Sequence, residues 1–181
     1  MGPDQEEEVI LSVLDGKREA YALLVDAYRT QIFNLAYRMT GNYEDASDLA
    51  QETFIRAYQN LRQFDPGKRF FTWLYTIGLN LIRNHLKKRG REMSREAEAR
   101  SSSEGGVDHG TQAEQDLIQA QEIRRLEICL QKLPDDLREA VVLRYYQDLS
   151  FEEIATISNA SLSAVKMRVY RGLEQLKRLI N

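Results

Sequence analysis

The apolar side chains in the first half of the chain recur with a helical period. Between Glu6 and about His85 they follow one another at steps of three and four residues, and no segment alternates with the two-residue period of a strand. Turn-forming residues interrupt this pattern at Gly16, at Gly41 and Asn42, and at residues 65–67 (Asp-Pro-Gly). We therefore predict helices near residues 6–15, 18–40, 43–62 and 69–89.

The periodic pattern stops at residues 93–115. This segment contains a serine run and a glycine pair but almost no large apolar side chain, so it can add little to a core. We predict that it is a flexible linker, in which His109 has no neighbour that would make it a ligand or a base. The expected fold is therefore all-α, with one small helical domain at 6–92 and a second at 116–181.

The second domain contains the local signals of a helix-turn-helix. After Leu133, Pro134 begins a helix with two aspartates in its first turn. Ser150 and Glu153 then form a capping box that opens a short helix, and Asn159 suits a left-handed turn. Ser161 can cap a longer helix from Leu162 to about Leu179, which completes the motif.

This longer helix has two distinct faces. Its buried stripe is predicted to comprise Leu162, Val165, Val169, Leu173 and Leu176. The opposite face combines cations with a hydroxyl and long side chains, namely Ser163, Lys166, Met167, Tyr170 and Arg171. Such a face suits the base edges and phosphates of a DNA major groove, with Arg144 and Arg168 as further phosphate contacts. A helix pair that binds protein is the alternative.

A second candidate face lies on the predicted helix 69–89. Phe70, Leu74, Ile77 and Leu81 form its apolar stripe. The other side carries an aromatic ring, a hydroxyl, amides and cations: Trp73, Thr76, Asn80, Arg83, Asn84 and Lys87. This mixture suits unpaired bases, which stack on a flat surface while amides read their edges and cations meet the backbone. The preceding turn from Phe64 to Lys68 could form one wall of a pocket for an extruded base. An ordinary solvated face would not explain Trp73 beside two asparagines.

Charge along the chain supports two basic segments within an acidic protein. The net charge of −3 divides into −6 for residues 1–61, +7 for 62–91, −6 for 92–139 and +2 for 140–181. The two basic segments coincide with the two candidate DNA faces, although solvated helix faces would give the same signs.

Composition limits the other classes of function. Cys129 is the only cysteine, which excludes an internal disulfide and a cysteine-based zinc site, and we expect it to be a buried thiol. No apolar run approaches the roughly 20 residues of a membrane helix, and the acidic amino terminus does not resemble a signal peptide, so a cytoplasmic protein without membrane insertion is expected. No catalytic constellation appears at a workable spacing, so we predict neither an enzyme nor a cofactor.

The order of these features resembles the extracytoplasmic-function sigma factors of bacterial RNA polymerase. The most specific segments are DASDLAQETFIRAYQNL (45–61), FDPGKRFFTWLYTIGLNLIRNHLKK (64–88), LPDDLREAVVLRYYQDLSFEEIA (133–155) and SAVKMRVYRGLEQLK (163–177). The resemblance covers nearly the whole chain.

The resemblance assigns roles to the candidate faces. It implies that Asp48, Gln51 and Glu52 contact the clamp coiled coil of the largest polymerase subunit, which agrees with a buried stripe of Ala50, Phe54, Ala57 and Leu61 on the same helix. It implies that residues 64–88 bind and melt the −10 element, with Asn80 near an unpaired non-template base. The helix-turn-helix would read the duplex −35 element through Lys166, Tyr170 and Arg171, with Arg144 and Arg168 assisting. An anti-sigma factor is expected as a further partner.

Two other classes of protein stay open. A stand-alone helix-turn-helix regulator accounts for residues 133–181 but leaves Trp73, Asn80 and the face from Asp48 to Glu52 without a role. A helical adaptor that binds only protein would show no salt-sensitive affinity for DNA.

Overall fold

A computed structural model describes residues 1–99 and 114–180, in which every regular element is a helix. The all-α prediction is therefore confirmed for this part of the chain. The first half contains α1 (Pro3–Leu14), α2 (Tyr21–Thr40), α3 (Tyr43–Gln59) and α4 (Phe70–Ala99), with short 3-10 turns at Arg18–Ala20 and Leu61–Gln63. The second half contains α5 (Glu114–Gln131), α6 (Asp135–Val141), a π-helical turn (Val142–Tyr146), α7 (Phe151–Ser158) and α8 (Leu162–Ile180).

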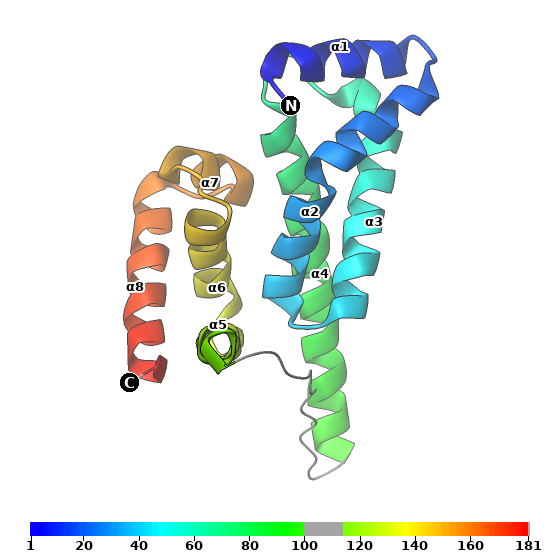
Figure 1. Ribbon diagram of the computed structural model, residues 1–181. Coiled ribbons are helices and arrows are strands. Elements are labelled where there is room, and N and C mark those ends of the chain that lie inside the picture. Colours follow the sequence, from blue (N-terminus) through cyan, green and yellow to red (C-terminus); the bar gives the residue numbers. More distant parts are fainter. Residues whose placement is uncertain (100–113, 181) are drawn as a thin grey trace.

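In the first half, α2, α3 and α4 run side by side, and α1 lies across one end of them (Figure 1). The junctions follow local chemistry. Gly41 ends α2 in a left-handed conformation at φ 68°, and the side chain of Asn42 then accepts the Asp45 N–H at 2.9 Å to begin α3. Asp65 accepts the backbone N–H groups of Gly67 and Lys68, which closes the turn before α4.

In the second half, α6, α7 and α8 pack together, and α5 lies at one end of them (Figure 1). The predicted helix-turn-helix signals are confirmed. Ser150 and Glu153 form the capping box, Asn159 is left-handed at φ 50°, and the Ser161 hydroxyl accepts the Ala164 N–H at 3.2 Å. The two domains also contact each other, chiefly through α4 against α7 and through α2 against α5 and α6.

The helix predicted for residues 69–89 is longer in the structure, because α4 continues to Ala99. Residues 91–99 are mostly Arg, Glu, Ala and Met, which favour a helix even without an apolar stripe. The predicted linker 93–115 is therefore helical at both ends, in α4 and in α5. Residues 100–113, including His109, lie outside the described residues.

Burial follows most of the predicted stripes but not all of them. The stripe of α3 and the thiol of Cys129 are buried as predicted. Leu162 was predicted to be buried and is 37% exposed, because it lies in the first turn of α8. On α4 the structure buries a second stripe, which the sequence pattern did not single out: Tyr75, Leu79 and Ile82.

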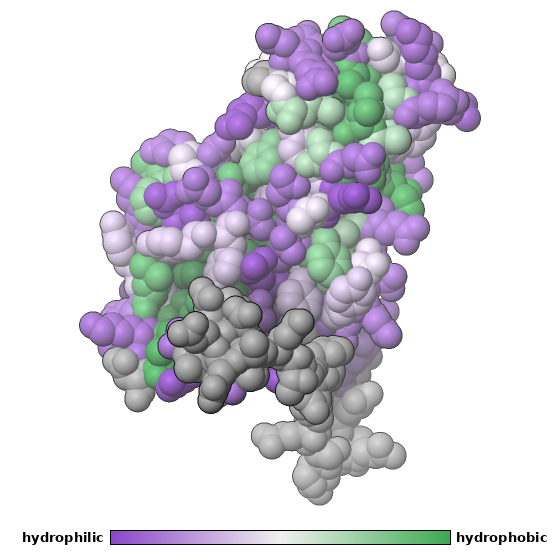
Figure 2. Space-filling view, viewed as in Figure 1, coloured by the Kyte–Doolittle hydropathy of each residue, from purple (hydrophilic) through white to green (hydrophobic). Residues whose placement is uncertain are grey.

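The surface is mainly hydrophilic, in agreement with a content of 29% charged residues. Hydrophilic residues cover most of the face seen in Figure 2, and smaller apolar areas lie between them. Within the described residues, no helix is both long and apolar enough to span a membrane.

Candidate nucleic-acid interface

Three of the six residues of the predicted α4 face are open to solvent. Asn80, Asn84 and Lys87 are exposed and lie about one helical turn apart. Thr76 is half-buried and donates its hydroxyl to the Thr72 carbonyl. The structure thus brings two amides and a cation together on one accessible stripe, as base reading beside a phosphate backbone requires.

Trp73 connects this stripe to the core. Its half-buried ring packs against Phe64 and Phe70, with ring centroids 5.3 Å and 5.6 Å away. Phe64 itself is only 9% exposed, so it supports Trp73 from below and offers little surface of its own. Of these three aromatic rings, Trp73 is the one on which a base could stack.

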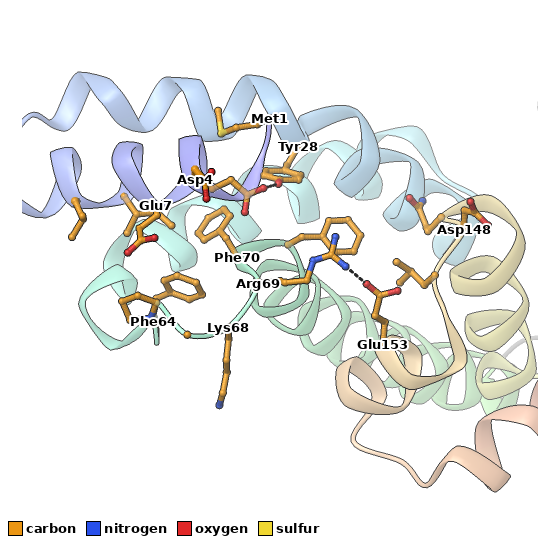
Figure 3. Close-up of a pocket in the computed structure, with 18 residues that line it drawn as sticks. Met1, Asp4, Glu7, Tyr28, Phe64, Lys68, Arg69, Phe70, Asp148 and Glu153 are labelled. Atoms are coloured by element: carbon orange, nitrogen blue, oxygen red, sulfur yellow. Dashed lines mark hydrogen bonds and ion pairs between the residues drawn. The ribbon is translucent and has the colours of Figure 1, made fainter.

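A cavity of about 600 Å³ lies beside the turn before α4 (Figure 3). Residues 64 and 66–71 form one side of it, and α1 with the start of α7 forms the other. Asp4 and Glu7 of α1 line the cavity, whereas the Lys68 side chain extends away from them (Figure 3). The cavity has the size of a small-molecule pocket, but its α1 side is acidic.

Two carboxylates near this cavity have pKa values that differ from the usual value of a glutamate. Burial raises the pKa of Glu6, which accepts the Tyr28 hydroxyl, although the chain's amino terminus and Arg69 act in the opposite direction. Burial also acts to raise the pKa of Glu153, but hydrogen bonds from Ser150 and the charge of Arg69 outweigh it and hold that pKa below its usual value. Glu153 is therefore ionised at neutral pH and forms an ion pair with Arg69 (Figure 3).

Arg83 differs from its neighbours on the predicted face. Its guanidinium donates two hydrogen bonds to Glu139 of α6, at 2.8 Å and 2.6 Å, and Glu139 also accepts the Ser158 hydroxyl at 2.8 Å. The structure thus places Arg83 at the border between the open stripe and the second domain. Sequence reasoning missed this pair because its members lie 56 positions apart.

The second predicted face lies on α8, where Ser163, Lys166, Met167, Tyr170 and Arg171 are all exposed. Lys166 lies over the ring of Phe151, 5.7 Å from its centroid. Tyr170 is 64% exposed and Met167 47%, so both stand clear of the domain.

The two arginines predicted to assist have partners within their own domain. Arg168 pairs with Asp136 at 3.6 Å. Arg144 donates to the Leu149 carbonyl at 3.0 Å and lies 3.7 Å from the Asp148 carboxylate. These contacts connect α6, the following turn and α8, so both arginines help to position the helix-turn-helix.

The third predicted face, on α3, is accessible. Asp48 and Gln51 are exposed, and Glu52 is half-exposed and pairs with Arg56 at 2.7 Å. A groove of about 1140 Å³ between α2 and α3 adjoins Gln51. Its lining includes the apolar side chains of Val25, Phe33, Tyr43, Phe54, Ile55 and Tyr58.

The sequence analysis missed this groove. Ile55 and Tyr58 lie one turn apart outside the buried stripe of α3, and Tyr43 precedes them at 68% exposure. Large apolar residues outside a buried stripe are the signal that could have revealed it, since exposed apolar areas mark interaction sites. Among the described residues, no group of three or more His, Cys, Asp or Glu side chains is placed to hold a metal ion.

Comparison with known proteins adds to this geometry. Residues 24–92 match the family Sigma-70 region 2, and residues 123–176 match the family Sigma-70, region 4. The chain is 37% identical over 175 residues to the ECF RNA polymerase sigma factor SigW of Bacillus subtilis, with 93% of each sequence covered. It is 33% identical to the RNA polymerase sigma-H factor of Pseudomonas aeruginosa, with 98% of this chain and 94% of that protein covered.

Two solved structures share the fold. CnrH in complex with the cytosolic domain of CnrY matches with a TM-score of 0.72 and 24% identity, over 97% of each chain. The sigma factor RpoE of Bartonella quintana, in complex with the anti-sigma factor NepR, matches with the same TM-score and identity over 88% of this chain and 96% of that one.

Proposed function

The chain belongs to the extracytoplasmic-function sigma factors of bacterial RNA polymerase, and we propose that its three exposed faces divide the work of this family among themselves. As a sigma factor, the protein associates with core RNA polymerase and directs it to promoters. In our proposal the α3 face binds polymerase, the α4 face holds the melted −10 element and the α8 face reads the duplex −35 element. The domain at 6–92 would thus carry the first two activities, and the domain at 116–181 the third.

The α3 face suits a protein partner. Asp48 and Gln51 offer accessible polar groups next to an apolar groove between α2 and α3. Protein interfaces combine an apolar centre with a polar rim, and this face presents both. The groove extends the polymerase-binding surface beyond the polar residues that the sequence suggested.

The α4 face suits single-stranded DNA. Asn80, Asn84 and Lys87 are exposed in a row beside Trp73. This row is the observation that carries the proposal, because an aromatic ring beside exposed amides and a cation offers unpaired bases a stacking surface, hydrogen-bond partners for their edges and a counter-charge for the backbone. Lys68, which extends from the turn before α4, would meet the backbone of the same strand.

The α8 face suits a major groove. Lys166, Tyr170 and Arg171 can reach base edges or phosphates from exposed positions, and Ser163 lies in the first turn of the same helix. Arg144 and Arg168 would act mainly by positioning this helix, since both are paired within the domain.

Further partners and the place of action follow from the same proposal. We infer a cytoplasmic protein that initiates transcription without catalysing a reaction itself. An anti-sigma factor is an expected partner, because RpoE of Bartonella quintana, which shares the fold, forms a complex with one.

Run-off transcription with core polymerase on a promoter library tests the proposal and identifies the promoter. We expect Asp48→Arg to abolish polymerase loading in a native gel, whereas Glu174→Lys, an exposed charge reversal on α8, should load normally. We expect Asn80→Ala to load normally and to lose permanganate-reactive thymines at the −10 element. Gln121→Ala removes an exposed amide from α5, outside the three proposed faces; it is the matched control and should open DNA as the wild type does.

A pre-melted bubble template separates strand opening from other steps. If Asn80→Ala acts on opening, the bubble should restore its transcription. Failure of that rescue would remove Asn80 from the opening step. Tight promoter binding without polymerase, together with no co-purification with core enzyme, would instead favour the stand-alone regulator.

A further inference from the structure

Two ion pairs join the domains along one edge of α4. Arg83 forms a two-pronged pair with Glu139 of α6, and Arg69, just before α4, pairs with Glu153 of α7. Both arginines belong to the basic segment 62–91, and both carboxylates belong to the domain that contains the helix-turn-helix. The second domain therefore supplies counter-charges to two arginines of the first.

These ion pairs occupy the guanidinium N–H donors with which the two arginines would bind DNA. A guanidinium binds a phosphate through the same planar pair of N–H donors that it offers to a carboxylate. Glu139 takes up this pair of donors on Arg83, so the side chain cannot bind a phosphate in the same way while the domains are closed. The neighbouring Asn80, Asn84 and Lys87 stay exposed.

Other contacts hold the same two surfaces together. The Tyr75 hydroxyl donates to Gln147 at 2.7 Å, and the guanidinium of Arg38 lies 4.2 Å from the centre of the Tyr146 ring. Tyr75 is fully buried. The Arg83–Glu139 pair is thus part of a packed interface, whereas the Arg69–Glu153 pair lies at its edge, where the Arg69 side chain is 68% exposed.

We propose that Glu139 and Glu153 are autoinhibitory carboxylates: they occupy Arg83 and Arg69 in place of promoter phosphates and hold the two domains closed until polymerase and DNA separate them. This inference rests on the proposed role of the α4 face. The closed form leaves the α3 face and the α8 face exposed, so polymerase and the −35 element can be met before the −10 face is complete. If only molecules with separated domains can bind single-stranded DNA fully, the apparent affinity is the affinity of the open form multiplied by the fraction of molecules that are open.

The test uses the full chain with Glu139→Gln and Glu153→Gln, singly and together. Glutamine at position 139 keeps an acceptor for the Ser158 hydroxyl, and glutamine at position 153 keeps one for the N–H and hydroxyl of Ser150, so helix content by circular dichroism should be unchanged. Small-angle X-ray scattering measures the radius of gyration. Fluorescence anisotropy measures the affinity for a labelled random-sequence single strand of about 12 nucleotides. Glu152→Gln removes the same charge from an exposed neighbouring position on α7 and is the matched control.

We expect the double variant to be less compact and to bind the single strand about tenfold more tightly, and Glu153→Gln alone about threefold. The control should change neither property. Arg69→Gln breaks the same ion pair from its other partner, leaves the Ser150–Glu153 capping box intact and should enlarge the radius as Glu153→Gln does, which supports the proposal even if the double variant folds poorly.

An unchanged radius in both the double variant and Arg69→Gln would overturn the proposal. So would a larger radius with unchanged affinity, because the carboxylates would then not withhold the face. Run-off transcription by the wild type is measured in parallel. Its absence would contradict the proposed function, whatever the radius of the variants.

Discussion

Individual cations on α8 differ in how freely they can reach DNA. Lys166 lies over the Phe151 ring, whereas Arg171 is exposed on the same face. A guanidinium can bind a guanine edge through two hydrogen bonds, whereas an ammonium acts as a point charge. The two residues should therefore make different contributions to −35 recognition.

We expect Arg171→Ala to weaken promoter binding by about 1 to 3 kcal/mol and to relax preference at one base pair. Lys166→Ala should weaken all sequences alike and reduce the slope of log affinity against log salt by about one unit. Binding of holoenzyme to −35 variants over a salt series measures both effects. Equal, sequence-independent losses would show that neither side chain reads a base.

For single residues, the sequence predicted correctly the helix caps and turns that depend on near neighbours in the chain. Ser150, Glu153 and Asn159 were assigned correctly because each cap depends on neighbours within three or four positions. Arg83 was expected on an open face with Trp73, and its pairing with Glu139 was not foreseen. A partner in another domain leaves no trace in local spacing.

At the scale of helices, Gly172 of α8 lies close against α6. A Cβ atom there would lie 2.6 Å from Val141 Cγ2 and 3.2 Å from the Leu137 carbonyl oxygen. The backbone oxygen cannot rotate away as a flexible side chain can. Gly172 therefore fixes how deeply α8 sits on its domain.

We expect Gly172→Ala to lower the free energy of unfolding by about 1 to 2 kcal/mol, even though alanine favours a helix by about 1 kcal/mol. Gly90→Ala is the matched control, since a Cβ at Gly90 would meet no atom within 4 Å and should stabilise α4 by about 0.5 to 1 kcal/mol. Urea denaturation measures both changes. If Gly172→Ala instead raised the free energy of unfolding, α6 would have to move away from α8 without loss of stability.

At the scale of elements, periodicity predicted which helices form better than it predicted how they are covered. Of the predicted stripe of α4, Phe70, Leu74 and Leu81 are buried and Ile77 is only partly buried, whereas Tyr75 and Leu79 are buried on another side. One apolar stripe indicates one packing partner, and α4 has several, since α2, α3 and α7 all contact it. The sequence pattern does not reveal that α4 packs against several helices; the three-dimensional structure does.

For the molecule as a whole, the carboxyl end of α2 is completed by the other domain. Gln131 donates to the Arg38 carbonyl at 2.7 Å, and Arg138 donates to the Met39 carbonyl. Arg138 is 7% exposed, and burial lowers its pKa although Asp135 acts in the opposite direction. A buried guanidinium is stable here because it also donates to Gln131, Leu133 and Asp135.

We expect Arg138→Ala to cost about 2 to 3 kcal/mol, because it leaves buried carbonyls without donors. In scanning calorimetry the wild type should unfold in one transition, and the variant in two, since the contact couples the domains. Arg178→Ala removes an exposed pair within α8 and should change stability by less than about 0.5 kcal/mol. Two transitions in the wild type would show that the domains are not coupled.

The cap of α2 by Gln131 and Arg138 also limits how such a protein can be recombined. A chimaera that joins the amino-terminal domain of this chain to the helix-turn-helix of a relative exchanges the donors but keeps the acceptors. If the incoming domain lacks an amide and a guanidinium at the equivalent places, the graft gains a new promoter preference and an incomplete helix end together. Exchanging the α2 terminus along with the incoming domain should keep that contact intact.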